Sequence, residues 1–184
     1  LGSLDLTGDG EPRRVDVMVL SSGYLEALDV PMVLGRTFDP SAEDVGGGNA
    51  VILSHAFWKA RFGGDRGVLG RSLVLDGKAH TIVGVAGSGL ALPGEDASTR
   101  AQLLVPLSLE DASAREGANM SFHAVGRLRR GLGAAAANAE LFRLDGVVGA
   151  ILGTLGSGHT VPFVADLHDE LMGDRKAPML LLQG

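Results

Sequence analysis

The sequence predicts an α+β fold in which a β-rich part is followed by a strand–helix–strand unit. Short apolar runs separated by turn residues dominate the first part, and an alanine-rich stretch with helical spacing follows residue 121. Glycine occurs 28 times in 184 residues, roughly double its usual ~7% share. Because glycine favours turns and bulges, this excess indicates many short elements joined by loops.

Alternating or continuous apolar residues predict six short strands in the first part. Val15, Val17 and Val19 alternate with Asp16 and Met18 in the first of them. An Asp-Gly pair between two apolar runs is a strong hairpin signal, and it joins the fourth and fifth strands. The predicted strands cover residues 15–19, 33–34, 50–53, 72–75, 80–83 and 103–105.

Two short helices are predicted between these strands. Ser21-Ser22-Gly23 supplies an N-cap for a helix from Tyr24 to Leu28, since small polar residues satisfy the free backbone N–H groups of a first turn. Ser54 caps a second helix, His55–Phe62, in the same way. Gly63 then suits the left-handed position that commonly ends a helix.

The second part has the pattern of a strand–helix–strand unit. Phe122–Leu128 alternates as a strand, and a helix is predicted from Leu132 to about Leu144, with an extension toward Leu155. Thr160–Val164 predicts the second strand, and a short helix follows over Leu167–Met172. The predicted organisation is therefore a β-rich subdomain with two short helices, a βαβ unit and a terminal segment, at residues 1–112, 113–176 and 177–184.

The last eight residues turn apolar through Met179–Leu182. No stretch of the sequence reaches the ~20 apolar residues that a membrane-spanning helix needs. We expect residues 177–184 to be the start of a truncated, membrane-proximal segment of a larger membrane-anchored protein.

Composition argues against several classes of function. The net charge is −6, and there are no cysteines, which removes disulfides, thiolate metal sites and cysteine nucleophiles. Basic residues never exceed two in a row, so the basic stripe that nucleic acid requires is missing. We expect no nucleic-acid partner.

The segment from Asp5 to Asp16 has the spacing of a calcium-binding loop. Oxygen-bearing side chains fall at loop positions 1, 3, 5 and 12, with a glycine at position 6; they are Asp5, Thr7, Asp9 and Asp16. However, Asp16 stands where a bidentate glutamate is usual, and the cationic Arg13 lies within the loop. A turn joining two strands is the favoured alternative, because Thr-Gly-Asp-Gly is good turn chemistry.

Other motifs give little support for catalysis or cofactor binding. Gly84–Gly89 resembles a phosphate-binding loop but lacks both the GxGxxG spacing and a following helix, so a loop after a strand is favoured. Ser157 and His159 could form part of a hydrolase site, but no Gly-x-Ser-x-Gly elbow surrounds them. His80 and His123 lie in strand patterns and are expected to be structural. We therefore predict no catalytic residue, no cofactor and no enzymatic activity.

The run from Val19 to Phe38 carries a family resemblance. It reads Val-Leu-Ser-Ser-Gly-Tyr-Leu-Glu-Ala-Leu-Asp-Val-Pro-Met-Val-Leu-Gly-Arg-Thr-Phe. It resembles the extracytoplasmic core domain of MacB-like, FtsX-type ABC transporter permeases, which has a strand, Ser/Pro-Gly-Tyr-Phe, a short helix and a Gly-Arg-x-Phe turn. Leu25 stands where the family usually has phenylalanine. Three further pieces resemble the family in the same order, at residues 50–70, 73–85 and 164–183.

This resemblance implies a β-rich, Sabre-like subdomain followed by a βαβ, porter-like subdomain, with the family's first βαβ unit lying before residue 1. It also implies a periplasmic domain of an inner-membrane permease that a separate cytoplasmic ATPase drives. The domain would transmit motion and bind a partner or cargo outside the membrane. An adaptor, a lipoprotein or a cell-wall enzyme would be such a partner.

Two alternative functions remain open from the residues alone. One is a free-standing extracytoplasmic binding module that depends on calcium through the Asp5–Asp16 loop; it predicts stability that depends on the ion. The other is a small hydrolase that uses Ser157 and His159; it predicts ester turnover that His159→Ala abolishes.

Overall fold

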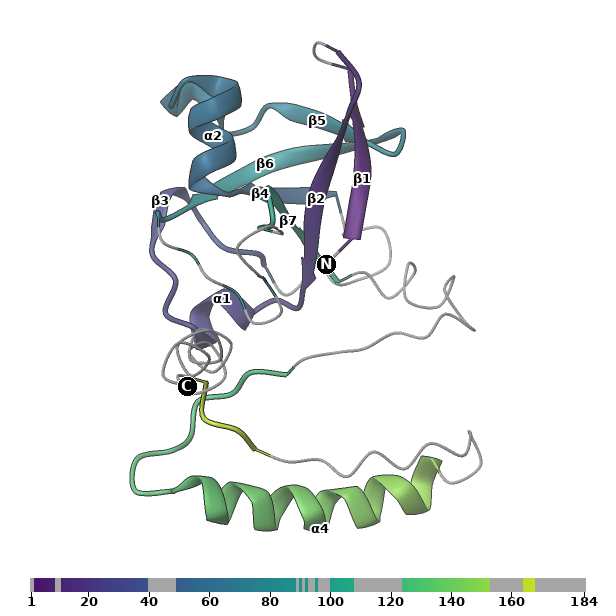
Figure 1. Ribbon diagram of the computed structural model, residues 1–184, viewed down its shortest axis with the longest axis vertical. Coiled ribbons are helices and arrows are strands. Elements are labelled where there is room, and N and C mark those ends of the chain that lie inside the picture. The colour runs from purple at the N-terminus through teal and green to yellow at the C-terminus, as the bar shows by residue number, and fades with distance from the viewer. Residues whose placement is uncertain are drawn as a thin grey trace, which may run out of the picture. The chain divides into compact units, whose positions relative to one another are not determined.

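A mixed sheet of seven strands, within the residues that the structure describes, organises the first of two units (Figure 1). The computed structural model describes residues 2–8, 11–39, 49–88, 90, 92, 95, 100–107, 124–152 and 164–167. It divides the chain into two compact units, residues 1–125 and 126–184. The predicted boundaries at 112 and 176 stay a prediction.

The strands of the first unit are β1 (Gly2–Thr7), β2 (Arg13–Leu20), β3 (Met32–Gly35), β4 (Ala50–Leu53), β5 (Ser72–Leu75), β6 (Lys78–Ala86) and β7 (Leu103–Pro106). Its helices are α1 (Tyr24–Ala27), α2 (His55–Phe62) and the 3-10 turn η2 (Arg66–Val68). The second unit contains α4 (Ala134–Leu152).

The sheet closes on itself. Its strand order is β3-β6-β4-β7-β2-β1-β5, and β5 also pairs with β6. Six strands therefore form a ring, and β3 extends along β6. The β2–β7 and β4–β6 pairs are parallel, and the remaining pairs are antiparallel. Such closure leaves most short strands paired on both sides, which removes the exposed edges that short strands otherwise present.

One face of the ring encloses an inner cluster of buried side chains, to which every strand contributes. Because successive strand residues point to opposite faces, Val51 and Leu53 of β4 belong to this cluster while Ile52 does not. The inner cluster consists of Leu6, Val15, Val17, Leu34, Val51, Leu53, Phe57, Trp58, Val68, Leu73, Leu75, Ile82, Val85, Leu103 and Val105.

The opposite face carries an outer cluster. It consists of Met18, Leu20, Leu25, Phe38, Ile52, Ala86, Leu92, Ala101 and Leu104, with Tyr24 and Met32 among the partly buried residues packed against it. In β2, Val15 and Val17 belong to the inner cluster, and Met18 and Leu20 belong to the outer one. Val19 has the parity of the inner cluster but is 42% exposed. The predicted strand is confirmed, but its third valine does not enter the core.

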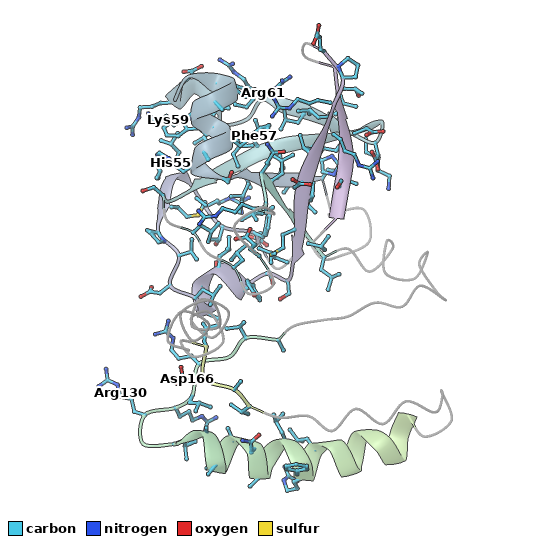
Figure 2. All side chains as sticks on the ribbon, viewed as in Figure 1. His55, Phe57, Lys59, Arg61, Arg130 and Asp166 are labelled. Carbon is cyan, nitrogen blue, oxygen red and sulfur yellow. The ribbon has the colours of Figure 1, made fainter. Side chains whose placement is uncertain are left out.

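Helix α2 covers the inner cluster with Phe57 and Trp58. Ser54 caps it by accepting a hydrogen bond from the Phe57 N–H at 3.3 Å, and Gly63 ends it with a left-handed backbone. Figure 2 shows Phe57 on the side of the helix that faces the sheet and Lys59 on the side away from it. The sequence prediction of this helix and its two caps is therefore confirmed.

Local signals also predicted the other short elements of this unit. Strand β4 has the predicted bounds, and β5 and β6 form the predicted hairpin around Asp76-Gly77. Strands β3 and β7 contain the predicted segments with one added residue at an end or at both. A mixed sheet with few helices is an α+β fold, as predicted.

The second unit differs from its prediction. Helix α4 confirms the long helix, although it begins two residues later and ends three residues earlier than the longest predicted span. Residues 124–128, predicted as part of the strand Phe122–Leu128, are not in a strand. Alternation alone was misleading here, because a strand also needs a hydrogen-bonding partner. Most of the predicted strand 160–164 and helix 167–172 lies outside the described residues.

Candidate functional site

The segment that joins β2 to β3 is the best-defined candidate site, because a short helix there lies over the outer cluster. Gly23 is the N-cap of α1, with a φ of 73°, and no side chain caps the helix. The predicted cap therefore falls on the glycine and not on either serine. Leu25 is 2% exposed and anchors α1 in the outer cluster.

The end of α1 is a left-handed closure. The Val30 N–H donates to the Leu25 carbonyl at 2.9 Å, and the Asp29 N–H donates to the Glu26 carbonyl at 3.0 Å. Asp29 has a φ of 56°, in the position where glycine is usual in a Schellman motif. The Thr37 hydroxyl donates to the Glu26 carboxylate. The first two bonds close the end of α1, and the bond from Thr37 holds the helix against the chain that follows β3.

Two glycines allow β3 to approach β6 closely. A Cβ atom added at Gly35, whose φ is 69°, would clash with the Val83 carbonyl oxygen and lie 2.9 Å from Gly84 Cα. One added at Gly84 would clash with the Arg36 carbonyl oxygen. This backbone contact joins the Gly35-Arg36 turn to the end of the hairpin at Ile82–Val85. The two segments belong to separate pieces of the sequence resemblance.

Tyr24 is the polar residue of the outer cluster. Burial raises the pKa of its phenol above the ordinary 10.0, and the nearby Glu95 carboxylate raises that pKa further. Glu95 itself accepts hydrogen bonds from the backbone N–H groups of Leu92 at 3.0 Å and Ala101 at 2.8 Å. The phenol therefore stays neutral near pH 7, and this arrangement positions chain segments rather than activating a nucleophile.

The candidate calcium loop lies on a hairpin. Strands β1 and β2 pair antiparallel, with Asp5 opposite Arg14 and Ser3 opposite Asp16. The Asp5 N–H donates to the Asp76 carboxylate at 2.7 Å, and the Asp16 carboxylate accepts from the Ser3 hydroxyl at 3.3 Å. Thr7 ends β1, and Asp9 lies outside the described residues. The turn between two strands is confirmed, while calcium binding stays a prediction.

The other motif residues are placed as follows. Gly84 lies within β6, so the first part of the predicted glycine loop is strand and not loop. His80 is 9% exposed, with Nδ1 3.0 Å from the Lys78 carbonyl oxygen. Ser157, His159 and His123 lie outside the described residues. Sequence reasoning missed the proximity of Glu95 to Tyr24, because it depends on the tertiary fold.

Within the described ranges, no group of three or more histidine, cysteine, aspartate or glutamate side chains is placed to hold a metal ion. In that same part of the chain, none of the helices combines the length and the apolar character that crossing a membrane would require.

A family profile described as the MacB-like periplasmic core domain matches residues 3–144. The chain belongs to this family. The match contains the Leu20–Phe38 segment, the Gly35–Gly84 contact and both clusters of the first unit. It identifies the chain as a MacB-like periplasmic domain, that is, an extracytoplasmic domain of a membrane protein. A comparison with curated protein sequences gave no significant match.

Two solved structures show the same fold, and a third has a weaker likeness. The periplasmic region of MacB from Actinobacillus actinomycetemcomitans is 15% identical with a TM-score of 0.55, over 83% of this chain and 64% of that one. A domain of a putative permease from Porphyromonas gingivalis is 18% identical with a TM-score of 0.52, over 79% and 65%. The extracellular domain of the noncanonic ABC-type transporter YknZ from Gram-positive bacteria is 22% identical with a TM-score of 0.47, over 64% and 56%.

The chain therefore spans less than two thirds of the length of each of these structures. The likeness supports the α+β fold of the MacB-type domain. The division into Sabre-like and porter-like subdomains is a finer statement that remains a prediction.

Proposed function

We propose that this domain transmits ATPase-driven motion of a parent permease and binds a partner or cargo outside the membrane. The observation that carries the proposal is the family match over residues 3–144. A separate cytoplasmic ATPase would supply the energy; the residues of this domain contain no P-loop motif of their own. An adaptor, a lipoprotein or a cell-wall enzyme would receive the motion.

The construction of the first unit supports a mechanical role. A ring of strands around a close-packed inner cluster has low compressibility, so a displacement at one side reaches the other side with little loss. The Gly35–Gly84 contact and the Glu26–Thr37 hydrogen bond attach the α1 segment to that ring. The unit would move as a rigid body.

A non-catalytic role is part of the proposal. His55 packs edge-on against Trp58 with ring centroids 5.6 Å apart, and His80 lies against a backbone carbonyl. Tyr24 has a raised pKa, the opposite of what a nucleophile at neutral pH needs. These groups have structural contacts that account for their positions.

Fluorescence transfer in the reconstituted parent permease tests the proposal. This domain contains no cysteine, so in a parent permease whose other cysteines have been replaced, Lys59→Cys and Arg130→Cys, on exposed positions of the two units, each give a single labelling site. With acceptors on the lipid headgroups, ATP should change the transfer efficiency of at least one label. A permease with a catalytically inactive ATPase is the control, and unchanged transfer at both labels during active hydrolysis would disprove motion transmission.

A further inference from the structure

The sequence Leu-Gly-Arg occurs twice, at residues 34–36 and 69–71. The structure brings both copies to the same edge of β6. The Gly70 N–H donates to the Ile82 carbonyl at 2.9 Å, and the Arg36 N–H donates to the next carbonyl, that of Val83, at 3.1 Å. Both glycines have left-handed backbones, with φ of 69° at Gly35 and 79° at Gly70.

A bulge in β6 explains how two turns share one edge. In a regular strand, successive carbonyl groups point to opposite edges. The pairing of β4 with β6 shifts register at this point, from Val51 opposite Ile82 to Ile52 opposite Gly84. Val83 is the extra residue, and its carbonyl turns to the same edge as that of Ile82.

The two turns are in direct contact. A Cβ atom added at Gly35 would lie 3.0 Å from Leu69 Cδ2, so the leucine of the second turn covers the glycine of the first. Arg36 and Arg71 follow the two glycines and are both exposed. We call Arg36, Leu69 and Arg71 the double-turn surface.

The side chains of this surface are held in place and still accessible. Arg71 Nη2 lies 2.7 Å from Asp65 Oδ2, and this ion pair is about half exposed on both sides. Arg36 Nη1 donates to the Thr37 carbonyl at 3.3 Å. Leu69 is 38% exposed beside them. Arginines around an exposed apolar side chain are the composition that protein interfaces favour.

The chain segment that leads to the second turn is basic, whereas the chain as a whole is acidic. Residues 54–71 contain four basic residues, Lys59, Arg61, Arg66 and Arg71, and one acidic residue, Asp65. Their net charge is 4 − 1 = +3, and since the chain has −6, the other residues together have −9. A local basic region on an acidic domain attracts an acidic partner and orients it.

We propose that the double-turn surface docks an acidic segment of a partner protein through Arg36 and Arg71, with Leu69 as the apolar contact between them. The inference rests on the proposed function, because it names the surface by which this domain would meet its partner. A protein is favoured over a membrane surface, since membrane attachment through charge uses larger basic clusters or amphipathic helices with broad apolar faces.

Fluorescence anisotropy with a labelled peptide of alternating glutamate and leucine tests the proposal on the full chain at low ionic strength. We expect saturable binding, and no binding of a lysine–leucine peptide of equal length. Arg36→Gln and Arg71→Gln should each weaken binding about ten-fold, because each removes a charge-assisted hydrogen bond. Leu69→Ser should weaken it less.

The matched control is Arg129→Gln/Arg130→Gln, which makes the same change in net charge as the Arg36→Gln/Arg71→Gln double variant. Both arginines are exposed and belong to the second unit. The control should bind the peptide like the parent chain. Equal weakening in the two double variants would overturn the proposal, because binding would then follow net charge alone.

Two other results would also overturn it. One is the absence of saturable peptide binding. The other is that the chain binds phosphatidylglycerol vesicles but not the peptide, and that the Arg36→Gln/Arg71→Gln variant no longer binds the vesicles. The surface would then recognise lipid. Thermal unfolding followed by the fluorescence of Trp58 verifies that each variant folds. The outcome is independent of the label experiment, so a permease that does not transmit motion could still bind the peptide through these arginines.

Discussion

The inner cluster receives side chains from every strand of the described sheet, whereas the outer cluster lies under a helix of four residues and the segments around it. The first is enclosed by hydrogen-bonded strands and α2. The second is closed by individual contacts, among them the Glu26–Thr37 bond and the Glu95 carboxylate. Local opening therefore requires less free energy at the outer cluster than at the inner one. The segment that would open is the one that carries the clearest family motif.

The chain offers one spectroscopic reporter for each cluster. Its single tryptophan, Trp58, is buried in the inner cluster, and its single tyrosine, Tyr24, packs against the outer one. Unfolding of the ring and opening of the α1 segment can therefore be followed separately.

The largest effect is expected where the two clusters meet, at the β3–β6 contact. Gly35→Ala should lower the free energy of unfolding by about 3–5 kcal/mol, because the methyl group clashes with backbone as well as straining a left-handed residue. Gly70→Ala is the matched control: its φ is 79°, but a Cβ there meets no atom within 4 Å. It should cost about 1–2 kcal/mol. Urea unfolding measures both losses of free energy. Equal losses in the two variants would contradict the role of the β3–β6 contact.

A leucine-to-alanine pair compares the clusters directly. Leu103 and Leu25 are 0% and 2% exposed. Leu103→Ala should lower the free energy of unfolding by about 4 kcal/mol and Leu25→Ala by about 2 kcal/mol. The difference arises because α1 can shift to fill the cavity that the smaller side chain leaves, whereas the ring cannot. Trp58 fluorescence during urea unfolding measures both costs. Equal values would mean that the outer cluster is packed as rigidly as the inner one.

The short elements of the first unit were predictable because their signals are local. Ser54 and Gly63 bracket α2, and Asp76-Gly77 joins β5 to β6, so neighbouring residues alone determine these features. The closure of the ring was not predictable, since the pairing of Leu6 with Leu75 joins residues far apart in the chain. The same holds for the contact between the two Leu-Gly-Arg turns, which depends on the bulge at Val83.

The candidate site shows the same division. The sequence predicted helix α1, but not the Glu95 carboxylate beside Tyr24, because no spacing rule connects residues 24 and 95. In the second unit, the alternation over residues 124–128 predicted a strand that the structure lacks. A periodic pattern determines which faces a segment would have, and a partner determines whether the strand forms.

Alkaline titration of Tyr24 measures how well the outer cluster excludes water. The folded pKa lies above the unfolded value near 10.0, so this residue's contribution to stability is complete below pH 10 and is lost as the pH rises through the folded pKa. Tyrosinate absorbance should have a midpoint above 10 in the folded chain, and Glu95→Gln should lower it. Tyr24→Phe should remove this part of the alkaline loss of stability. A folded midpoint equal to that in urea would show that Tyr24 is solvated.

The smallest effect concerns two aspartates with left-handed backbones, Asp29 with a φ of 56° and Asp76 with a φ of 46°. Asp76 Oδ1 accepts a hydrogen bond from the Asp5 N–H and so ties β1 to the hairpin, whereas Asp29 has no side-chain hydrogen bond within the described part of the chain. Asp29→Gly should therefore stabilise the chain by about 0.5 kcal/mol, because glycine adopts this backbone without strain.

Asp76→Gly provides the contrast. It relieves the same backbone strain but removes the bond from the Asp5 N–H to the Asp76 carboxylate, and it should lower the free energy of unfolding by about 1 kcal/mol. Thermal unfolding of the two variants side by side, followed at Trp58, decides the point. Stabilisation by both changes would mean that the Asp76 carboxylate contributes nothing to the ring. Destabilisation by both would mean that Asp29 has a role at the end of α1 beyond its backbone conformation, and the outer cluster would then depend on a polar contact there.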